Sequence, residues 1–227
     1  MDLTFLQRLG TALKNAHNMI RCRGLYQHAG LSWRSDADPL EIAGLVYQAS
    51  MTHKTSLGLS ARSSWSSCPP SGPASGPVSG TGAERKPHTV GLWLIDRNFD
   101  TTKNRERMTS TDQIKAVQEA IREAPEASHI VLVPMKLSPQ AKKETLHAEV
   151  FLFDDLLINL SAHEWILPHK RVSIEEARAV LGAKMNPDDL PVLPRSDPVA
   201  KWWAFPEGSI IRIDNPTMIS YRIVKNV

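Results

Sequence analysis

The chain has 227 residues, enough for two small domains, and its 41% hydrophobic and 22% charged residues are ordinary for a globular protein. Its net charge of +3 excludes a histone-like nucleic-acid binder but is compatible with a nucleic-acid neighbour. Two cysteines, Cys22 and Cys68, exclude a disulfide framework and favour a reducing, intracellular compartment. No apolar run approaches the roughly 20 residues that cross a bilayer, so we expect no membrane partner.

Two helices are predicted near the amino terminus. Apolar residues recur at helical spacing from Leu6 to Ile20, and Gly24 is a plausible stop. Asp38 and Pro39 supply a cap and a first-turn proline for a second helix that runs towards Ala49.

The segment from Leu57 to Pro87 has a different composition, in which Ser-Gly recurs every four residues from Ser71. Such a segment has little to bury against the entropy of ordering it. We interpret 57–87 as a flexible surface loop, either a tolerated insertion or a docking or phosphorylation segment. Its deletion is expected to leave folding and assembly intact.

The residues that follow predict a three-layer α/β domain. Thr89–Ile95 and His129–Met135 are apolar runs typical of strands buried on both faces. Between them, a capping box at Ser110–Gln113 opens a helix. A strand, a helix and a strand in this order favour parallel pairing through a crossover. Further strands are predicted at 151–153 and 156–160.

A smaller α+β domain is predicted at the carboxy terminus. Capping residues at Ser173–Glu176 open a helix that ends near Gly182, and 186–191 form a turn or short helix. Asp197 and Pro198 open another short helix, in which at least one of two neighbouring tryptophans, 202 and 203, belongs to the core. Gly208 supplies positive φ before a hairpin of strands at 209–213 and 218–224. We place the domains at residues 1–147 and 148–227.

The motifs of several enzyme classes are absent. A His-Glu-x-x-His zinc site would need a histidine at 167, but the next one after His163 is His169, beyond Pro168. We therefore interpret this segment as a structured loop whose histidines and Glu164 bond backbone groups or a partner. Phosphate-binding glycine motifs are also missing.

A metal-dependent nuclease site is not supported either. Asp96 ends one strand, but no (Asp/Glu)-x-Lys follows on the next, and Glu149 is followed by Val150 and Phe151. The pair Asp154-Asp155 is expected to be a turn or surface cap. We expect no catalytic residue, metal or bound cofactor.

Several carboxy-terminal motifs recur together in one known family. They are Asp197–Lys201, Gly208, Ile210–Ile213 and Tyr221–Ile223, preceded by His163-Glu164, Pro168–Lys170 and Leu190-Pro191. In this order and spacing they resemble the assembly domain of the fifth-largest shared subunit of eukaryotic nuclear RNA polymerases, a family that also has archaeal members. In the first domain the resemblance rests on element order and on Leu137–Lys142, which is similar to a family loop. The final turn is shorter than the family's, so the chain resembles a divergent member.

This resemblance implies a non-catalytic subunit of a nuclear DNA-directed RNA polymerase, in the nucleoplasm or nucleolus. Its first domain would be a lower-jaw module near downstream duplex DNA, and its second an assembly module bound to the largest subunit. Catalysis would belong to the two largest subunits, and no small-molecule substrate is expected. The resemblance does not distinguish a subunit of polymerase I, II or III from one that all three share. The alternative is a stand-alone Mg-dependent nucleic-acid-processing enzyme, or an adaptor, with the same α/β core.

The resemblance also implies two sets of functional residues. The set near DNA is Lys136, Ser138, Pro139, Gln140, Lys142 and Lys143. The set at the subunit interface is His163, Glu164, Pro168, His169, Lys170, Asp197, Pro198, Lys201, Gly208, Arg212, Tyr221 and Arg222.

Overall fold

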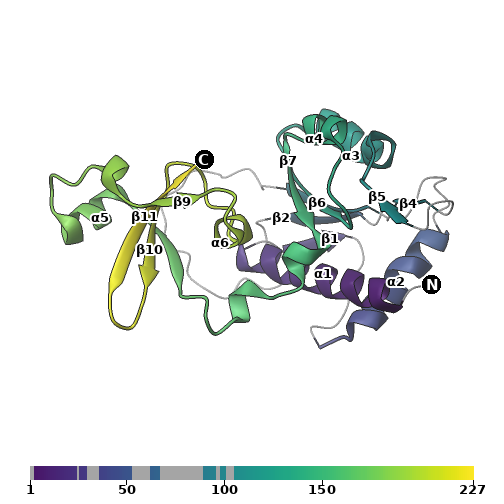
Figure 1. Ribbon diagram of the computed structural model, residues 1–227, viewed down its shortest axis with the longest axis horizontal. Helices are drawn as coiled ribbons and strands as arrows, with labels where there is room; N and C mark the ends of the chain where they lie inside the picture. The colour runs from purple at the N-terminus through teal and green to yellow at the C-terminus, as the bar shows by residue number, and fades with distance from the viewer. Residues whose placement is uncertain are drawn as a thin grey trace. The chain divides into compact units, whose positions relative to one another are not determined.

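A computed structural model describes residues 3–24, 26–29, 36–52, 62–66, 89–95, 98–100 and 105–227. The chain divides into two compact units, Met1–Leu157 and Ile158–Val227 (Figure 1). Cys22 is a free, exposed cysteine, whereas Cys68 and Asp96 lie outside the described residues. The described helices include none with the length and apolar character to span a membrane.

The first unit is built on a mixed sheet of five strands in the order β1-β2-β3-β6-β7. These strands are β1 (Tyr26–Ala29), β2 (Arg62–Ser66), β3 (Thr89–Leu94), β6 (Ser128–Val133) and β7 (Ala148–Leu152). The pairs β1–β2 and β2–β3 are antiparallel, and β3–β6 and β6–β7 are parallel. Because β7 pairs within this sheet, the first unit ends ten residues beyond the predicted boundary after residue 147.

Two helices cross between the parallel strands. Helix α3 (Thr111–Glu123) lies between β3 and β6, and the Ser110 amide at its start donates to Gln113 Oε1 at 3.0 Å. Helix α4 (Pro139–Glu144) lies between β6 and β7. The predicted capping box and parallel crossover are therefore confirmed. The short strands β4 (Asn98–Asp100) and β5 (Arg105–Arg107) pair with each other outside the main sheet.

Helices cover both faces of the sheet, as the continuous apolar runs of β3 and β6 predict. Figure 1 shows α3 and α4 on one side and α1 (Leu3–Cys22) and α2 (Pro39–Thr52) on the other. The core under α3 and α4 consists of Trp93, Ile95, Ile114, Val117, Ala120, Val131, Val133 and Ala141. Leu92, Leu94, Ile130 and Leu132 alternate with these strand residues and are equally buried.

The first two helices end and begin as predicted. Gly24 follows α1 with φ of 77°, and the Asp38 carboxylate accepts the Leu40 amide at 2.8 Å before α2. The two helices approach each other closely at Gly10. A Cβ added to Gly10 would lie only 1.7 Å from the Pro39 carbonyl oxygen.

Two loop and strand predictions are wrong. Strand β2 lies inside the segment predicted to be a flexible loop. The composition of this segment does not favour a strand, but β2 forms because it pairs with β1 and β3 on either side. The rest of 57–87 lies outside the described residues. No strand forms at 156–160, and Phe153–Leu156 is a 3₁₀ turn. The Asp155 carboxylate closes that turn by accepting the Leu152 amide at 3.1 Å, which confirms the predicted turn or cap.

The second unit contains a four-stranded sheet in the order β8-β10-β11-β9. Its strands are β8 (His169–Val172), β9 (Val192–Pro194), β10 (Ile210–Asp214) and β11 (Ile219–Lys225). The predicted antiparallel hairpin is β10–β11; β8 is antiparallel to β10, and β9 is parallel to β11. Strands β8 and β9 were not predicted, because they are short and lack an alternating apolar pattern.

Two capped helices flank this sheet. Ser173 Oγ accepts the Glu176 amide at 3.1 Å at the start of α5 (Ile174–Leu181), which Gly182 follows with φ of 107°. Asp197 accepts the Val199 amide at 2.8 Å at the start of α6 (Pro198–Trp202). The turn predicted at 186–191 contains a 3₁₀ helix, Pro187–Asp189. These helix predictions are confirmed.

Each sheet face in the second unit has its own small core. One contains Leu193, Ala200, Phe205, Ile211, Ile213 and Val224, and therefore lies on the α6 side. The other contains Ala177, Ile210 and Tyr221, with Ile174 and Val172 packed against it, and therefore lies on the α5 side.

Candidate functional site

Three predicted interface residues lie side by side on the α5 side of the second sheet. Register places Lys170 of β8 opposite Arg212 of β10, and Arg212 opposite Tyr221 of β11. Directly opposed residues on neighbouring strands point to the same face. Helix α5 packs near Ile210 and Val172, two positions along the strands from this row.

Two cations of this row share one carboxylate. Arg212 Nε donates to Asp214 at 2.6 Å, and Lys170 Nζ lies 3.7 Å from the other Asp214 oxygen. The Lys170 side chain is 67% exposed and that of Arg212 is 31% exposed. Ile219, opposite Asp214, is 46% exposed. We call Lys170, Arg212, Asp214 and Ile219 the open row. Together they form a surface of net positive charge beside an exposed apolar side chain.

Tyr221 lies beside the open row, directly opposite Arg212, and is buried. It is 6% exposed, and its hydroxyl has no hydrogen-bond partner among the described residues. A buried hydroxyl in this state is a donor and acceptor that a water or a polar group of a partner would satisfy.

His169 belongs to the opposite face. Its ring stacks on Trp203 with centroids 6.3 Å apart, and Trp203 stacks in turn on Phe205. Its Nδ1 lies 2.6 Å from the Leu167 carbonyl oxygen, so the ring bonds a backbone group as expected. Trp202 is 1% exposed, which confirms that one of the neighbouring tryptophans belongs to the core.

The segment before β8 presents an exposed aromatic residue. The Trp165 amide donates to His163 Nδ1 at 3.3 Å, and the Trp165 side chain is 80% exposed. Glu164 is exposed, and the Pro168 carbonyl accepts the Asp214 amide at 3.0 Å. Sequence reasoning missed Trp165, because helical or strand spacing carries no signal for an aromatic residue that stands out from a loop.

The other predicted interface residues are spread over the unit. Asp197 caps α6, Pro198 is the first residue of that helix, and Gly208 has φ of 77°, so each has a role in the local fold. Lys201 is half-buried on α6. Arg222 is exposed on the same face as Ile211, and its Nη1 lies 3.5 Å from the Val192 carbonyl oxygen. The twelve residues therefore do not form one patch.

The residues predicted near DNA form the start of a helix instead of a loop. The Thr109 amide donates to the Lys136 carbonyl at 3.1 Å, and the Ser138 amide donates to the Thr109 carbonyl at 2.9 Å. Ser138 Oγ then accepts the Ala141 amide at 3.2 Å, with Pro139 in the first turn of α4. This serine and proline fit an N-cap, which explains the difference from the predicted loop.

Three exposed lysines lie in this helix or just before it. Lys136, Lys142 and Lys143 are all exposed, and none forms an ion pair within the described part of the chain. Pro139 and Gln140 are exposed, and Gln140 Nε2 donates to Glu144 Oε1 at 2.7 Å. Glu144 also accepts a hydrogen bond from Gln118, which joins α4 to α3.

A groove of about 570 Å³ lies beside α4. It is lined by Thr111, Lys115, Gln118, Ile121, Arg122, Glu144 and His147. A hydrogen bond from Lys115 to Asp112, reinforced by the charge of that carboxylate, raises the pKa of Lys115. The groove therefore carries cationic groups, Lys115 and Arg122, next to the exposed lysines of α4.

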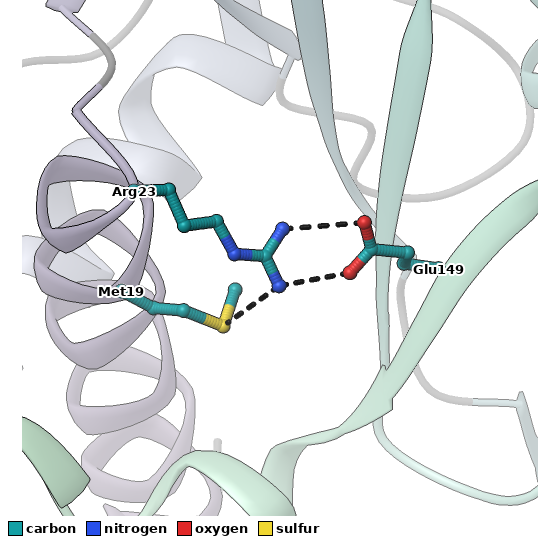
Figure 2. A network of polar contacts seen from close by, with 3 residues as sticks. All are labelled: Met19, Arg23 and Glu149. Carbon is teal, nitrogen blue, oxygen red and sulfur yellow. Dashed lines mark hydrogen bonds and ion pairs between the residues drawn. The ribbon is translucent and has the colours of Figure 1, made fainter. Parts of the chain in front are cut away.

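Glu149, considered above as part of a metal site, has a structural role. Figure 2 shows it in a two-pronged ion pair with Arg23, at 3.2 and 2.8 Å, and Arg23 also donates to Met19 Sδ at 3.7 Å. The Arg23 side chain is only 9% exposed, so this pair ties the end of α1 to β7. Within the described ranges, no three His, Cys, Asp or Glu side chains gather as a group that could hold a metal.

Comparisons with known proteins point to one family. A family model described as RNA polymerase Rpb5, C-terminal domain, matches residues 158–224. The chain is 37% identical over 68 residues to DNA-directed RNA polymerase subunit Rpo5 of Sulfurisphaera tokodaii, a match that covers 30% of this chain and 81% of that protein.

Eukaryotic relatives match a longer stretch. Identity to DNA-directed RNA polymerases I, II, and III subunit RPABC1 of Caenorhabditis elegans is 28% over 123 residues, covering 49% of this chain and 58% of that protein. Identity to the subunit rpabc1 of Dictyostelium discoideum is 25% over 121 residues, covering 49% and 61%. The chain thus spans a little under two thirds of the length of these relatives.

Proposed function

Because this chain belongs to the RNA polymerase Rpb5 family, we propose that it is a non-catalytic subunit of a nuclear DNA-directed RNA polymerase. The family resemblance predicted from its motifs is confirmed. One observation carries the proposal: the family match, residues 158–224, coincides with the compact unit Ile158–Val227. A whole folding unit, and not a scattered set of motifs, is therefore shared with polymerase subunits.

In this proposal the second unit holds the chain on the polymerase, through its largest subunit. The open row offers two cations and an exposed isoleucine on one sheet face. Trp165 adds a large, 80% exposed aromatic side chain. Aromatic and arginine side chains are the usual anchors of protein interfaces, which supports a docking role for this unit.

The first unit is proposed to lie near downstream duplex DNA. Lys136, Lys142 and Lys143 are exposed and free of internal ion pairs among the described residues, so they can approach phosphates. Contacts of this kind position a duplex without reading its sequence, and they weaken as salt rises. Catalysis is assigned to other subunits, and no cofactor is proposed for this chain.

Purification of a tagged full-length chain from nuclear extract tests the main proposal. We expect the polymerase subunits to be recovered with it at moderate ionic strength, and their identity will distinguish polymerases I, II and III. Recovery of the tagged chain without any polymerase subunit would refute the proposal.

A charge-reversal experiment tests the DNA contact separately. Within an assembled polymerase, Lys142→Glu with Lys143→Glu should make the negative slope of log affinity for duplex DNA against log salt less steep by about 1 to 2, because phosphate contacts are lost. The matched control is Lys184→Glu with Arg195→Glu, two exposed cations of the second unit. Equal slopes for both double variants would refute the DNA contact and leave the subunit proposal intact.

A further inference from the structure

The two outer edges of the second sheet differ. Strand β9 forms one edge, and it is short, ends in Pro194 and follows Pro191. Proline has no amide to donate, so this edge is a poor template for another strand. Strand β8 forms the other edge with four residues that all carry an amide, and no described strand pairs with its outer side.

The β8 edge also carries a cation on each side. Lys170 and Arg171 are adjacent and exposed, and successive strand residues point to opposite faces. Lys170 has Arg212 as its cross-strand neighbour, which adds positive charge to its face. Arg171 and Arg222 flank Ile211 on the other face. Among these four cations, Lys170 and Arg212 share the Asp214 carboxylate, so the edge keeps a net positive charge.

We propose that the outer edge of β8 accepts an extended, acidic segment of another polymerase subunit as an additional strand. Backbone hydrogen bonds would hold the segment, as in other cases of strand addition. Because an added strand also alternates its side chains, two consecutive carboxylates would meet Lys170 on one face and Arg171 on the other. This inference rests on the proposed function and names the chemistry of the partner.

The same charges disfavour two competing occupants of this edge. A second copy of this chain pairing through β8 would bring lysine and arginine against each other, which disfavours a symmetric dimer. A neutral strand would leave both cations without a partner, and lysine on an edge strand is a common protection against such pairing. An acidic segment is the occupant for which the charges favour binding.

Hydrogen exchange on the intact assembly tests this inference. In polymerase purified through the tagged chain, we expect the β8 amides that point away from β10 to exchange at least tenfold more slowly than in the free chain. Lys170→Glu with Arg171→Glu should reduce the polymerase recovered at least tenfold, whereas the control Lys184→Glu with Arg195→Glu should not. Unfolding curves of both double variants should match that of the unaltered chain, because all four side chains are exposed.

The outcomes separate the two proposals. If polymerase is recovered but the β8 amides exchange as fast as in the free chain, strand addition is refuted and the subunit proposal stands. Equal recovery with the β8 and control double variants would likewise refute the acidic partner. If the unaltered chain recovers no polymerase subunit, the proposed function fails, and the strand-addition inference fails with it.

Discussion

The two units of the chain treat their polar side chains differently. In the first, the Arg23–Glu149 ion pair ties α1 to β7, and Asn15 donates to the Leu156 carbonyl at 2.7 Å from a buried position. In the second, Lys170, Arg171 and Arg222 are exposed at the surface of the sheet. These polar groups of the first unit join its own layers, whereas the cations on the second sheet lie where a partner can reach them.

This difference follows from how each sheet is covered. The first sheet has helices on both faces, and Leu92–Leu94 of β3 and Ile130–Val133 of β6 are buried and apolar. The second is smaller, and α5 packs on only part of one face, which leaves the open row uncovered. The partly uncovered sheet of the second unit is suited to docking, whereas the covered sheet of the first unit is suited to stability on its own.

The largest expected effect concerns strand β2. Deleting Leu57–Pro87 removes β2, which pairs with both β1 and β3, so we expect the first unit to lose cooperative unfolding. Deleting only Ser71–Arg85 keeps β2 and leaves Ser67–Pro70 and Lys86–His88 to connect it to β3, so this variant should unfold like the parent. Urea unfolding followed by circular dichroism measures both. A cooperative first unit in the larger deletion would contradict the assignment of β2 to the sheet.

A second prediction compares two tryptophans of the second unit. Trp202 is 1% exposed and Trp165 is 80% exposed. Trp202→Ala should destabilise the second unit by about 3–5 kcal/mol, because it leaves a large cavity, whereas Trp165→Ala should change the free energy of unfolding by less than about 0.5 kcal/mol. Denaturant titration of the full chain measures both. Similar losses for the two variants would show that Trp165 is also packed.

Local signals in the sequence predicted the ends of helices well. The caps at Ser110, Asp38, Ser173 and Asp197 form as expected, because each depends on a side chain bonding a backbone amide two or three residues away. The β10–β11 hairpin was predicted for the same reason: Gly208 and the turn after Asp214 are short-range signals.

Long-range pairing explains what sequence reasoning missed. Strand β2 lies in a segment of low complexity, and β8 and β9 are short and polar or contain proline, so only their neighbours in the sheet make them strands. The open row has the same origin: Lys170 and Arg212 are distant in the chain, and register alone brings them together. The family motifs identified those residues, but could not show which of them share a face.

A third prediction uses pH to separate the units. Burial, aided by the charge of Arg21, lowers the pKa of His17 in α1 to about 3. In the unfolded chain this ring is protonated below about pH 6.5. The contribution of neutral His17 to the free energy of unfolding is therefore fully present above that pH and is lost as the pH falls towards 3. The slope contributed by His17 should approach about 1.4 kcal/mol per pH unit. Urea titrations between pH 7 and 5 should show this slope, and His17→Gln should flatten it. An equally steep profile in His17→Gln would contradict the buried, neutral state of the ring.

The smallest expected effect isolates backbone conformation in the second unit. Gly208 has φ of 77°, and a Cβ added there would meet nothing within 4 Å. Gly208→Ala should therefore cost about 1 kcal/mol through its backbone alone, because the left-handed region disfavours a Cβ. Gly208→Asn should cost less, since asparagine tolerates that region better than alanine. Thermal unfolding of the full chain would order the variants as Gly, Asn and Ala. If asparagine destabilises the second unit as much as alanine, the loss comes from contacts of the new side chain, and the turn is more crowded than its geometry indicates.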